Sequence, residues 1–333
     1  MSIAVRSFAK INLGLKIGPA RADGFHELRT IYQTLALHDV VRVEVQNGSG
    51  IEIRCNDPRV PLDESNTCYK VAERVLKAAK ASAKVIVQID KRLPVQGGLG
   101  AGSSNAVATM LGLERALETK LSAEDKMRIA AEIGSDVPLF LIGGTVLGIG
   151  RGEEVYPLPD LPRMHLVVVT PPIAVSTPKA FAQWDKLVAR EAELTGAGAA
   201  GTINTFSQAV DAWLKERVFS QVVSASGPAS GVPAMGGDRA ETPLLDLVRA
   251  GIENDFERVV FPEYPDLREV KRVLEREGAR YASLSGSGST VYGLFPSGEE
   301  AQAAAARLCA SGHAAVATTT LTREEYWKEV ARG

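Results

Sequence analysis

Apolar and polar positions in the first half of the chain predict strands interleaved with helices. Val85, Val87 and Ile89 recur at every second position, as in a strand with one buried face. Apolar residues from Ala106 to Leu117 recur instead at the spacing of a helix. The same reasoning predicts strands at 2–15, 40–45 and 145–149 and helices at 66–79 and 122–133.

The second half of the chain has the same mixture of patterns after an interruption. Three prolines between positions 157 and 162 break regular structure, and residues 165–170 then have the pattern of a buried strand. We therefore expect one domain at 1–162 and a second at 163–333. Residues 224–242 are rich in Gly, Ala, Ser and Pro without any period, which predicts a flexible insertion. Further helices are expected at 178–190, 203–216, 244–250, 265–277 and 298–310, and strands at 281–284, 291–295 and 314–319.

Composition fits a globular protein without polyanionic partners. The 333 residues suffice for two domains, and 45% hydrophobic and 23% charged residues are typical of soluble proteins. A formal net charge of -2 gives no basic excess, so we expect neither a nucleic-acid nor a membrane partner. Arg6 and Lys10 interrupt the apolar stretch that a signal peptide needs, which favours a cytoplasmic location. The cysteines are only three and lack C-x-x-C spacing, so we expect no disulfide framework or zinc site. These patterns do not determine the oligomeric state.

A glycine-rich loop between a predicted strand and a predicted helix is the strongest indication of chemistry. It consists of Pro94, Val95, Gln96, Gly97, Gly98, Leu99, Gly100, Ala101, Gly102, Ser103 and Ser104. Such a loop presents backbone N–H groups and a helix N-terminus to an anion. Ser103 stands where a P-loop has its lysine, and the dinucleotide pattern G-x-G-x-x-G is absent, so neither motif applies. A glycine-rich turn without a ligand remains the alternative.

Two separate segments carry polar side chains suited to catalysis. Lys10 and Asn12 share one face of a predicted strand, because apolar residues take the positions between them. Asp136 follows a helix-ending Gly134, and near a lysine its carboxylate could accept a proton from a hydroxyl. The alternatives are a solvated strand face for the first pair and an ordinary turn residue for Asp136.

Two loops have features beyond those of a plain turn. Asp23-Gly24 is typical of a hairpin turn, and Phe25 and His26 beside it are suited to stacking on a base and hydrogen-bonding it. Residues 285–290 separate two strand patterns and offer a second glycine-rich backbone surface to a phosphate. A packed or surface histidine and a flexible connection are the respective alternatives.

In their order along the chain, these segments resemble the GHMP kinase superfamily, named after galactokinase, homoserine kinase, mevalonate kinase and phosphomevalonate kinase. The segments that carry the resemblance are 9–13, 21–26, 90–94, the glycine loop, 134–138 and 285–290. The resemblance implies a two-domain α+β fold with the active site in the cleft between the domains. It also implies a kinase that uses ATP and Mg²⁺. Residues 21–26 match members whose small-molecule substrate is a cytidine diphosphate derivative.

The resemblance also assigns roles near the transferred phosphate. Asp136 would take the proton of the acceptor hydroxyl, while Lys10 would orient that hydroxyl and offset negative charge. The glycine loop would wrap the ATP phosphates, with Ser104 as a candidate Mg²⁺ contact. Two residues at family positions near the nucleotide are Asn66 and Lys91.

Substrate-binding roles follow from the same resemblance. His26 would hydrogen-bond the cytosine, Phe25 and Phe181 would stack on its two faces, and Asn12 would line the pocket. Phe25 stands where the family often has tyrosine, so a hydrogen bond from that hydroxyl is lost. The segment 187–242 is longer and richer in Gly and Ala than the family pattern, so the resemblance does not define the edge of the pocket on that side.

Other functions compatible with parts of the pattern are a homoserine or mevalonate kinase, a diphosphomevalonate-decarboxylase-like lyase and a sensor that binds without turnover. The segment 21–26 disfavours the first two kinases, which need no cytosine site. The presence of both Lys10 and Asp136 disfavours the sensor.

Overall fold

The computed structural model describes residues 2–95, 97–195, 208, 210 and 253–332. Gln96, the insertion at 224–242, the helix expected at 244–250 and most of the helix expected at 203–216 lie outside the described residues. No helix in the described ranges is both long and apolar enough to cross a membrane.

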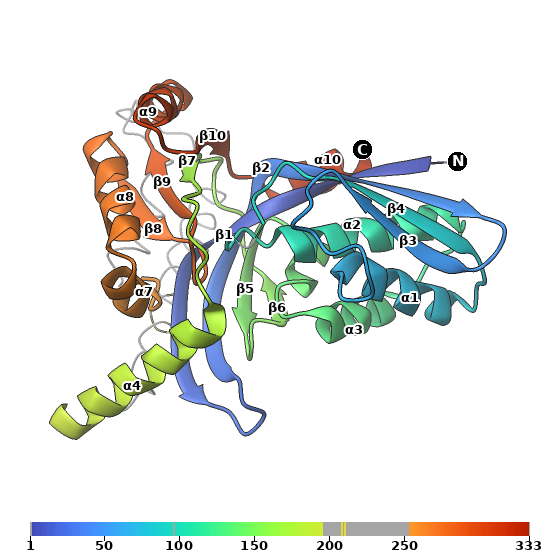
Figure 1. Ribbon diagram of the computed structural model, residues 1–333, viewed down its shortest axis with the longest axis horizontal. Coiled ribbons are helices and arrows are strands. Elements are labelled where there is room, and N and C mark those ends of the chain that lie inside the picture. The colour runs from blue at the N-terminus through green and yellow to red at the C-terminus, as the bar shows by residue number, and fades with distance from the viewer. Residues whose placement is uncertain (1, 96, 196–207, 209, 211–252, 333) are drawn as a thin grey trace, which may run out of the picture.

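The first unit is a mixed sheet covered by helices. Its strands follow the order β3-β4-β2-β5-β6, with β1 paired to β2. Helices α1, α2 and α3 lie on one side of this sheet (Figure 1). The strands are β1 (Ser2–Ala20), β2 (His26–Gln46), β3 (Gly50–Cys55), β4 (Lys84–Asp90), β5 (Thr145–Ile149) and β6 (Glu154–Pro157). The helices are α1 (Thr67–Ala79), α2 (Ala101–Ala116), α3 (Ala123–Ile133) and the 3-10 helix η1 (Pro138–Leu141).

The second unit is an antiparallel sheet of order β10-β7-β9-β8. Its strands are β7 (His165–Val169), β8 (Tyr281–Leu284), β9 (Val291–Phe295) and β10 (Ala315–Thr319). Its helices are α4 (Thr177–Thr195), α7 (Glu257–Glu263), α8 (Pro265–Arg276) and α9 (Gly298–Ala310). Helix α10 (Arg323–Ala331) packs back into the first unit, where Tyr326 and Val330 join its apolar core. The expected α+β class is confirmed, and the division at residue 162 stays a prediction.

The expected strands at 2–15 and 40–45 are parts of one longer hairpin. Strand β1 continues to Ala20 and pairs with β2 along its length, with a turn at Asp23-Gly24 in which Gly24 has φ +82°. The register shifts between Phe8 and Lys10 and again between Asn12 and Gly14. Such bulges redirect side chains and are frequent beside active sites. They flank the two polar residues that the strand presents.

The hairpin also joins the two units. Ile11 and Leu13 of β1 belong to an apolar cluster that includes Leu166 of β7 and Leu294 of β9. Lys10 and Asn12 alternate with these residues and so face the other way. One strand therefore anchors the second sheet with one face and carries polar groups on the other.

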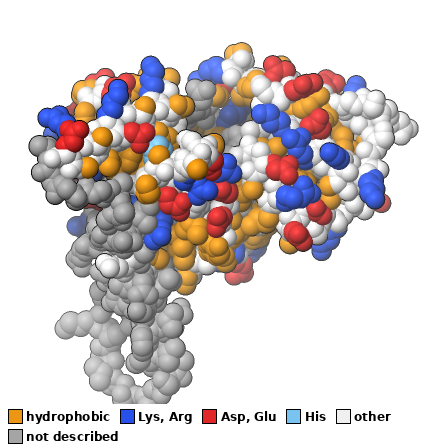
Figure 2. Space-filling view, turned by 90° about the horizontal axis from the view of Figure 1, so that it is seen from below, with side chains coloured by type: hydrophobic (Ala, Val, Ile, Leu, Met, Phe, Trp, Pro, Cys, Tyr) orange, Lys and Arg blue, Asp and Glu red, His pale blue; other side chains and the backbone are white. Residues whose placement is uncertain are grey.

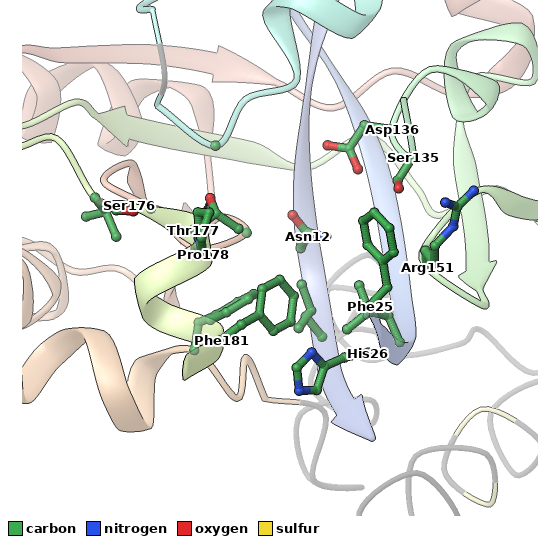
Figure 3. Close-up of a pocket in the computed structure, with 18 of the residues that line it drawn as sticks. Asn12, Phe25, His26, Ser135, Asp136, Arg151, Ser176, Thr177, Pro178 and Phe181 are labelled. Atoms are coloured by element: carbon green, nitrogen blue, oxygen red, sulfur yellow. Dashed lines mark hydrogen bonds between the residues drawn. The ribbon is translucent and has the colours of Figure 1, made fainter. Parts of the chain in front are cut away.

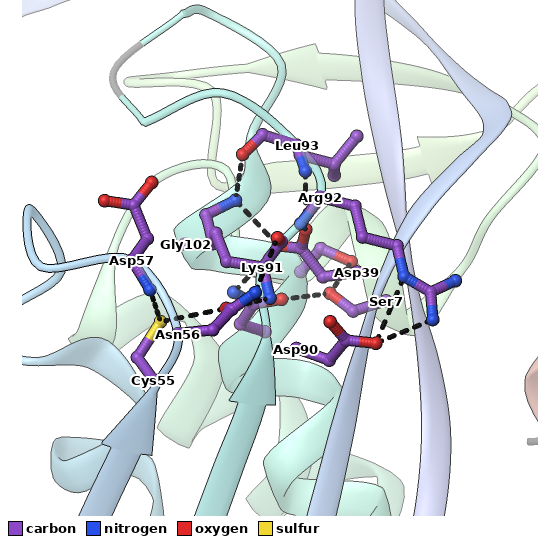
Figure 4. Close-up of polar contacts among 12 residues, drawn as sticks. Ser7, Asp39, Cys55, Asn56, Asp57, Asp90, Lys91, Arg92, Leu93 and Gly102 are labelled. Atoms are coloured by element: carbon purple, nitrogen blue, oxygen red, sulfur yellow. Dashed lines mark hydrogen bonds and ion pairs between the residues drawn. The ribbon is translucent and has the colours of Figure 1, made fainter.

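A buried carboxylate fixes the start of the glycine loop. Asp39 of β2 is fully buried and accepts hydrogen bonds from the backbone N–H groups of Arg92 and Leu93, both at 2.7 Å. Its second oxygen accepts from Lys91 Nζ at 2.8 Å and from Asn105 Nδ2 at 3.1 Å. Figure 4 shows these contacts converging on Asp39. The carboxylate thus connects β2, the residues before the loop and helix α2.

We predict strong coupling between Asp39 and Lys91. Asp39→Asn or Lys91→Met alone leaves a buried group of this pair without its counterion, which should cost about 3–5 kcal/mol of unfolding free energy. The double variant Asp39→Asn/Lys91→Met removes both charges, so its loss should be smaller than the sum of the single losses by about 1–3 kcal/mol. Urea unfolding of the four proteins measures this, and additive losses would contradict it.

Candidate active site

The structure buries the pair of polar residues on β1. Lys10 is 3% exposed and Asn12 1% exposed, and Lys10 Nζ donates to Asn12 Oδ1 at 2.7 Å. Lys10 Nζ also lies 3.2 Å from Asp136 Oδ2. A solvated strand face is therefore wrong for this pair. The buried ammonium is held by an amide oxygen and a carboxylate.

Asp136 is oriented by side chains of the sheet rather than by its own turn. Helix α3 begins after Ser122, whose hydroxyl accepts from Asp125 N–H, and Asp136 follows three residues after its last residue, Ile133. Tyr32 of β2 donates to Asp136 Oδ1 at 3.0 Å. Burial, reinforced by the charge of Asp136, raises the pKa of Tyr32 well above its ordinary value. Tyr32 thus stays a hydrogen-bond donor to Asp136 across the neutral range.

The glycine loop leads into the N-terminus of α2. Gly98 and Gly100 have φ of +78° and +68°, values that other residues rarely adopt. Gly100 is the N-cap of α2, and no described side chain caps the helix there, so its first N–H groups are free for an anion. Lys10 N–H donates to Leu99 O at 3.0 Å, which fixes the loop to β1.

The loop at 285–290 packs directly on the glycine loop. Thr290 N–H donates to Gly97 O at 3.1 Å, and Ser285 Oγ donates to Gly98 O at 2.9 Å. A Cβ on Gly98 would lie 2.2 Å from the carbonyl oxygen of Ser285, so only glycine permits this approach. The two loops form one wall. The segment 285–290 is held by these contacts, so the alternative that it is a flexible connection is wrong.

Two cavities meet at this wall. The larger, of about 710 Å³, is lined by Lys10, Asn12, Asp136 and residues of the second unit such as Phe181. The smaller, of about 390 Å³, is lined by most of the glycine loop. Gly98 lines both cavities. Figure 3 shows Asp136 and Phe25 on one side of the larger cavity and Thr177 and Phe181 on the other.

The expected cytosine site lies at the far end of the larger cavity. His26 Nε2 lies 2.6 Å from Asp185 Oδ1. The His26 ring stacks on Phe181 at a centroid distance of 4.7 Å with 9° between the planes. Phe25 is half exposed, and the Arg151 guanidinium lies 4.8 Å from the centre of its ring. The structure brings these residues together, but His26 covers one face of Phe181, so a base stacking there would displace the imidazole.

Of the remaining sequence-predicted residues, Asn66 and Lys91 lie at the smaller cavity and Ser104 lies at neither cavity. Both side chains at the smaller cavity are engaged: Asn66 caps α1 by accepting from Cys68 N–H, and Lys91 bonds Asp39. Ser104 lines neither cavity and accepts a hydrogen bond from Ser7 Oγ at 2.8 Å. In the described ranges, no group of three or more His, Cys, Asp and Glu residues could hold a metal ion.

Sequence reasoning missed Tyr32 and Arg151. Tyr32 is opposite Asn12 across the hairpin, a pairing that the bulges of β1 and β2 conceal. Arg151 lies in the Gly150-Arg151-Gly152 turn between β5 and β6, and glycines on both sides are also typical of a turn without function. The signal that the sequence offered was an arginine between two glycines at the tip of a hairpin.

Comparisons with known proteins show the family of the chain. The family models described as GHMP kinases N terminal domain and GHMP kinases C terminal match residues 66–144 and 241–314. A relative from Solibacter usitatus named 4-diphosphocytidyl-2-C-methyl-D-erythritol kinase is 36% identical over 87% of this chain and 80% of its own. One of the same name from Acaryochloris marina is 33% identical over 90% and 89%. A solved structure named 4-(cytidine 5'-diphospho)-2C-methyl-D-erythritol kinase is 30% identical with a TM-score of 0.68, covering 96% of this chain and 99% of that one.

The site holds an ammonium and a carboxylate in contact beside a glycine-rich loop, and both units match the family models of the GHMP kinases. The chain is a kinase of that class. Since its relatives match over most of its length, it belongs to the family of 4-diphosphocytidyl-2-C-methyl-D-erythritol kinases.

We predict that Tyr32→Phe lowers kcat with little change in either KM. A hydrogen bond to a charged group contributes about 1.5–3 kcal/mol, so loss of the Tyr32 donor to Asp136 should reduce kcat by about 10- to 100-fold. Tyr326→Phe is the matched control, because it removes a buried hydroxyl that bonds Phe140 O away from both cavities. Steady-state kinetics of both variants test this, and a Tyr32→Phe enzyme at the wild-type rate would refute it.

Proposed function

We propose that this chain transfers the γ-phosphate of ATP to the 2-hydroxyl of 4-diphosphocytidyl-2-C-methyl-D-erythritol, in the non-mevalonate pathway to isoprenoid precursors. The observation that carries the proposal is the Lys10–Asp136 contact in the larger cavity, which shares Gly98 of the glycine loop with the smaller one. The cytoplasmic location stays a prediction from the sequence. On the face in Figure 2, acidic and basic side chains are interspersed, which fits a small-molecule substrate better than a polyanion.

ATP would place its phosphates on the glycine loop. The uncapped N–H groups of α2 and the positive end of its dipole favour negative charge there. The smaller cavity beside Asn66 and Lys91 is then the place for the rest of the nucleotide. Because Lys91 is bonded to Asp39 and Leu93 O, we propose that it supports the loop and leaves contact with ATP to its neighbours.

Transfer would rely on Asp136 and Lys10. The acceptor hydroxyl would donate its proton to the Asp136 carboxylate as its oxygen attacks the γ-phosphorus, and the bond to the β-phosphate oxygen breaks. Lys10, fixed between Asn12 and Asp136, would orient the hydroxyl and offset negative charge on the phosphoryl oxygens. Tyr32 would keep Asp136 turned toward the acceptor.

A Mg²⁺ ion bound together with ATP needs only a few ligands from the protein. The ion usually takes one or two carboxylates, substrate phosphates and water, and it needs no all-protein cage. The Ser103 and Ser104 hydroxyls lie at the start of α2, and Asp136 is reserved for the acceptor hydroxyl. Bound with ATP, the ion would neutralise phosphate charge. Ser104 as its contact stays a prediction, since that hydroxyl is bonded to Ser7.

The far end of the larger cavity would bind the cytidine diphosphate. Phe25 offers an exposed ring for the base, and His26 offers hydrogen bonding. Arg151 lies beside the Phe25 ring and lines the same cavity, where a guanidinium suits a diphosphate (Figure 3). A cavity of about 710 Å³ is also much larger than a homoserine or mevalonate molecule needs.

We predict that the purified protein with Mg·ATP forms ADP with 4-diphosphocytidyl-2-C-methyl-D-erythritol. Homoserine and mevalonate lack a group for the His26 and Phe25 end, so their turnover should be negligible. A coupled ADP assay over the three alcohols measures this, and diphosphomevalonate with carbon dioxide detection tests the lyase. Preferred turnover of a small alcohol, or release of carbon dioxide, would overturn the proposal.

Replacing the proposed base gives a separate prediction. Asp136→Asn keeps the side-chain volume but cannot take the proton, so kcat should fall by about 10²–10⁴-fold while ATP affinity stays nearly intact. Kinetics and calorimetric titration with an ATP analogue measure the two effects. Asp125→Asn, which neutralises an exposed carboxylate on α3, is the control and should keep the wild-type rate. Near-normal turnover in Asp136→Asn would remove Asp136 from this role.

A further inference from the structure

The segment from Glu253 to Glu257 connects the strand that carries Lys10 with the loop at 285–290. Its backbone pairs with the end of β1: Leu15 N–H donates to Glu253 O at 3.0 Å, and Asp255 N–H donates to Leu15 O at 2.9 Å. A buried ion pair between Lys16 and Asp255, at 2.9 Å, reinforces this junction. The segment is therefore fixed to β1 before any contact with the loop is considered.

Asn254 extends from this segment to the loop. It is 2% exposed, and its Nδ2 donates to Leu284 O and to Gly286 O, both at 2.8 Å. Its Oδ1 accepts from Phe256 N–H at 3.0 Å. Every polar atom of the side chain is paired, and both donors go to carbonyls on either side of Ser285. No other side-chain type of this size offers two donors and an acceptor in this geometry.

The two carbonyls that Asn254 holds set the position of the wall between the cavities. Gly286 has φ +57° and lines the larger cavity. A Cβ on Gly286 would lie 3.5 Å from Asn12 Oδ1 and 3.7 Å from Lys10 Nζ, so the loop backbone passes directly over the ammonium. Ser285, between the two held carbonyls, makes the contact with Gly98 of the glycine loop.

We propose that Asn254 is a positioning residue for phosphoryl transfer, because its amide holds the 285–290 loop at a fixed distance from Lys10 and Gly98. The inference rests on the proposed function. Transfer requires donor and acceptor to be aligned, and a shift of about 1 Å from a distant change can cost about 10²-fold in rate. Without the amide, the loop keeps its contacts to the glycine loop, but Leu284 O and Gly286 O lose the bonds that hold them to the segment paired with β1.

A matched control exists in the same segment. Ser283 Oγ donates to Glu257 Oε1 at 2.8 Å, and Leu284 N–H donates to that same oxygen at 2.9 Å. Ser283→Ala therefore removes a buried hydrogen bond of this region while the loop and its two held carbonyls stay in place. Any effect that comes only from weakened packing of the segment should occur in both variants.

The test compares Asn254→Ala with Ser283→Ala. We expect kcat of Asn254→Ala to fall by about 30- to 100-fold with both KM values within about threefold, and kcat of Ser283→Ala to stay within about twofold. Hydrogen exchange supplies a readout without substrate: the Gly288 and Thr290 amides, bonded to Ser285 O and Gly97 O, should exchange faster in Asn254→Ala alone. Asn254→Ser, with one donor, should be intermediate, and it replaces Asn254→Ala if that variant does not fold.

Several outcomes would overturn the inference. These are a wild-type kcat in Asn254→Ala, a rise in KM with kcat unchanged, or equal losses in Ser283→Ala. Absence of turnover by the wild-type enzyme would instead count against the proposed function, and the exchange of the Gly288 and Thr290 amides would still decide whether Asn254 holds the loop.

Discussion

The site depends on one buried ammonium. Removing Lys10 Nζ from water is costly unless charge and hydrogen bonds compensate, and here Asn12 Oδ1 and the Asp136 carboxylate do so at 2.7 and 3.2 Å. The backbone N–H of Lys10 also holds Leu99 O of the glycine loop. Lys10 thus links the proposed base to the glycine loop, through its ammonium and its backbone N–H. Such preorganisation is what electrostatic catalysis needs.

Buried lysine–aspartate pairs also hold the surroundings of the site in place. Lys91 and Asp39 fix the residues before the glycine loop (Figure 4), and Lys16 and Asp255 fix the segment that carries Asn254. Pairs of this kind add little net stability, because desolvation offsets much of the attraction. Their effect is on geometry, since each carboxylate also accepts backbone N–H groups, of Leu93 and of Ile17. The two buried pairs therefore fix the position of the residues before the glycine loop and of the segment that carries Asn254.

Much of this arrangement was predictable from the sequence, and the exceptions have physical causes. The glycine loop, the Ser122 cap and the Asp23-Gly24 turn depend on local backbone chemistry, which neighbouring residues determine. The position of Tyr32 opposite Asn12 depends on the register of the hairpin. Ala20 pairs with His26, so without bulges residue 34 would lie opposite Asn12. The bulges bring Tyr32 there instead. The role proposed for Asn254 depends on its tertiary contact with Gly286, which no periodic pattern in the sequence indicates. Helix α10 is short, and its packing in the apolar core of the first unit depends on contacts between residues far apart in the chain.

The missing P-loop lysine now has an explanation. Ser103 takes the position of the P-loop lysine, and the buried cation of the proposed site is Lys10 of β1. The glycine loop is then free to be covered by the 285–290 backbone, at a distance that a side chain on Gly98 would prevent. If Lys10, Asp136 and both loops serve phosphoryl transfer as proposed, they would act on any acceptor hydroxyl, and selectivity would come from the other end of the cavity. Phe25, His26 and Arg151 line that end of the cavity, and on the proposed function they would set the choice of substrate.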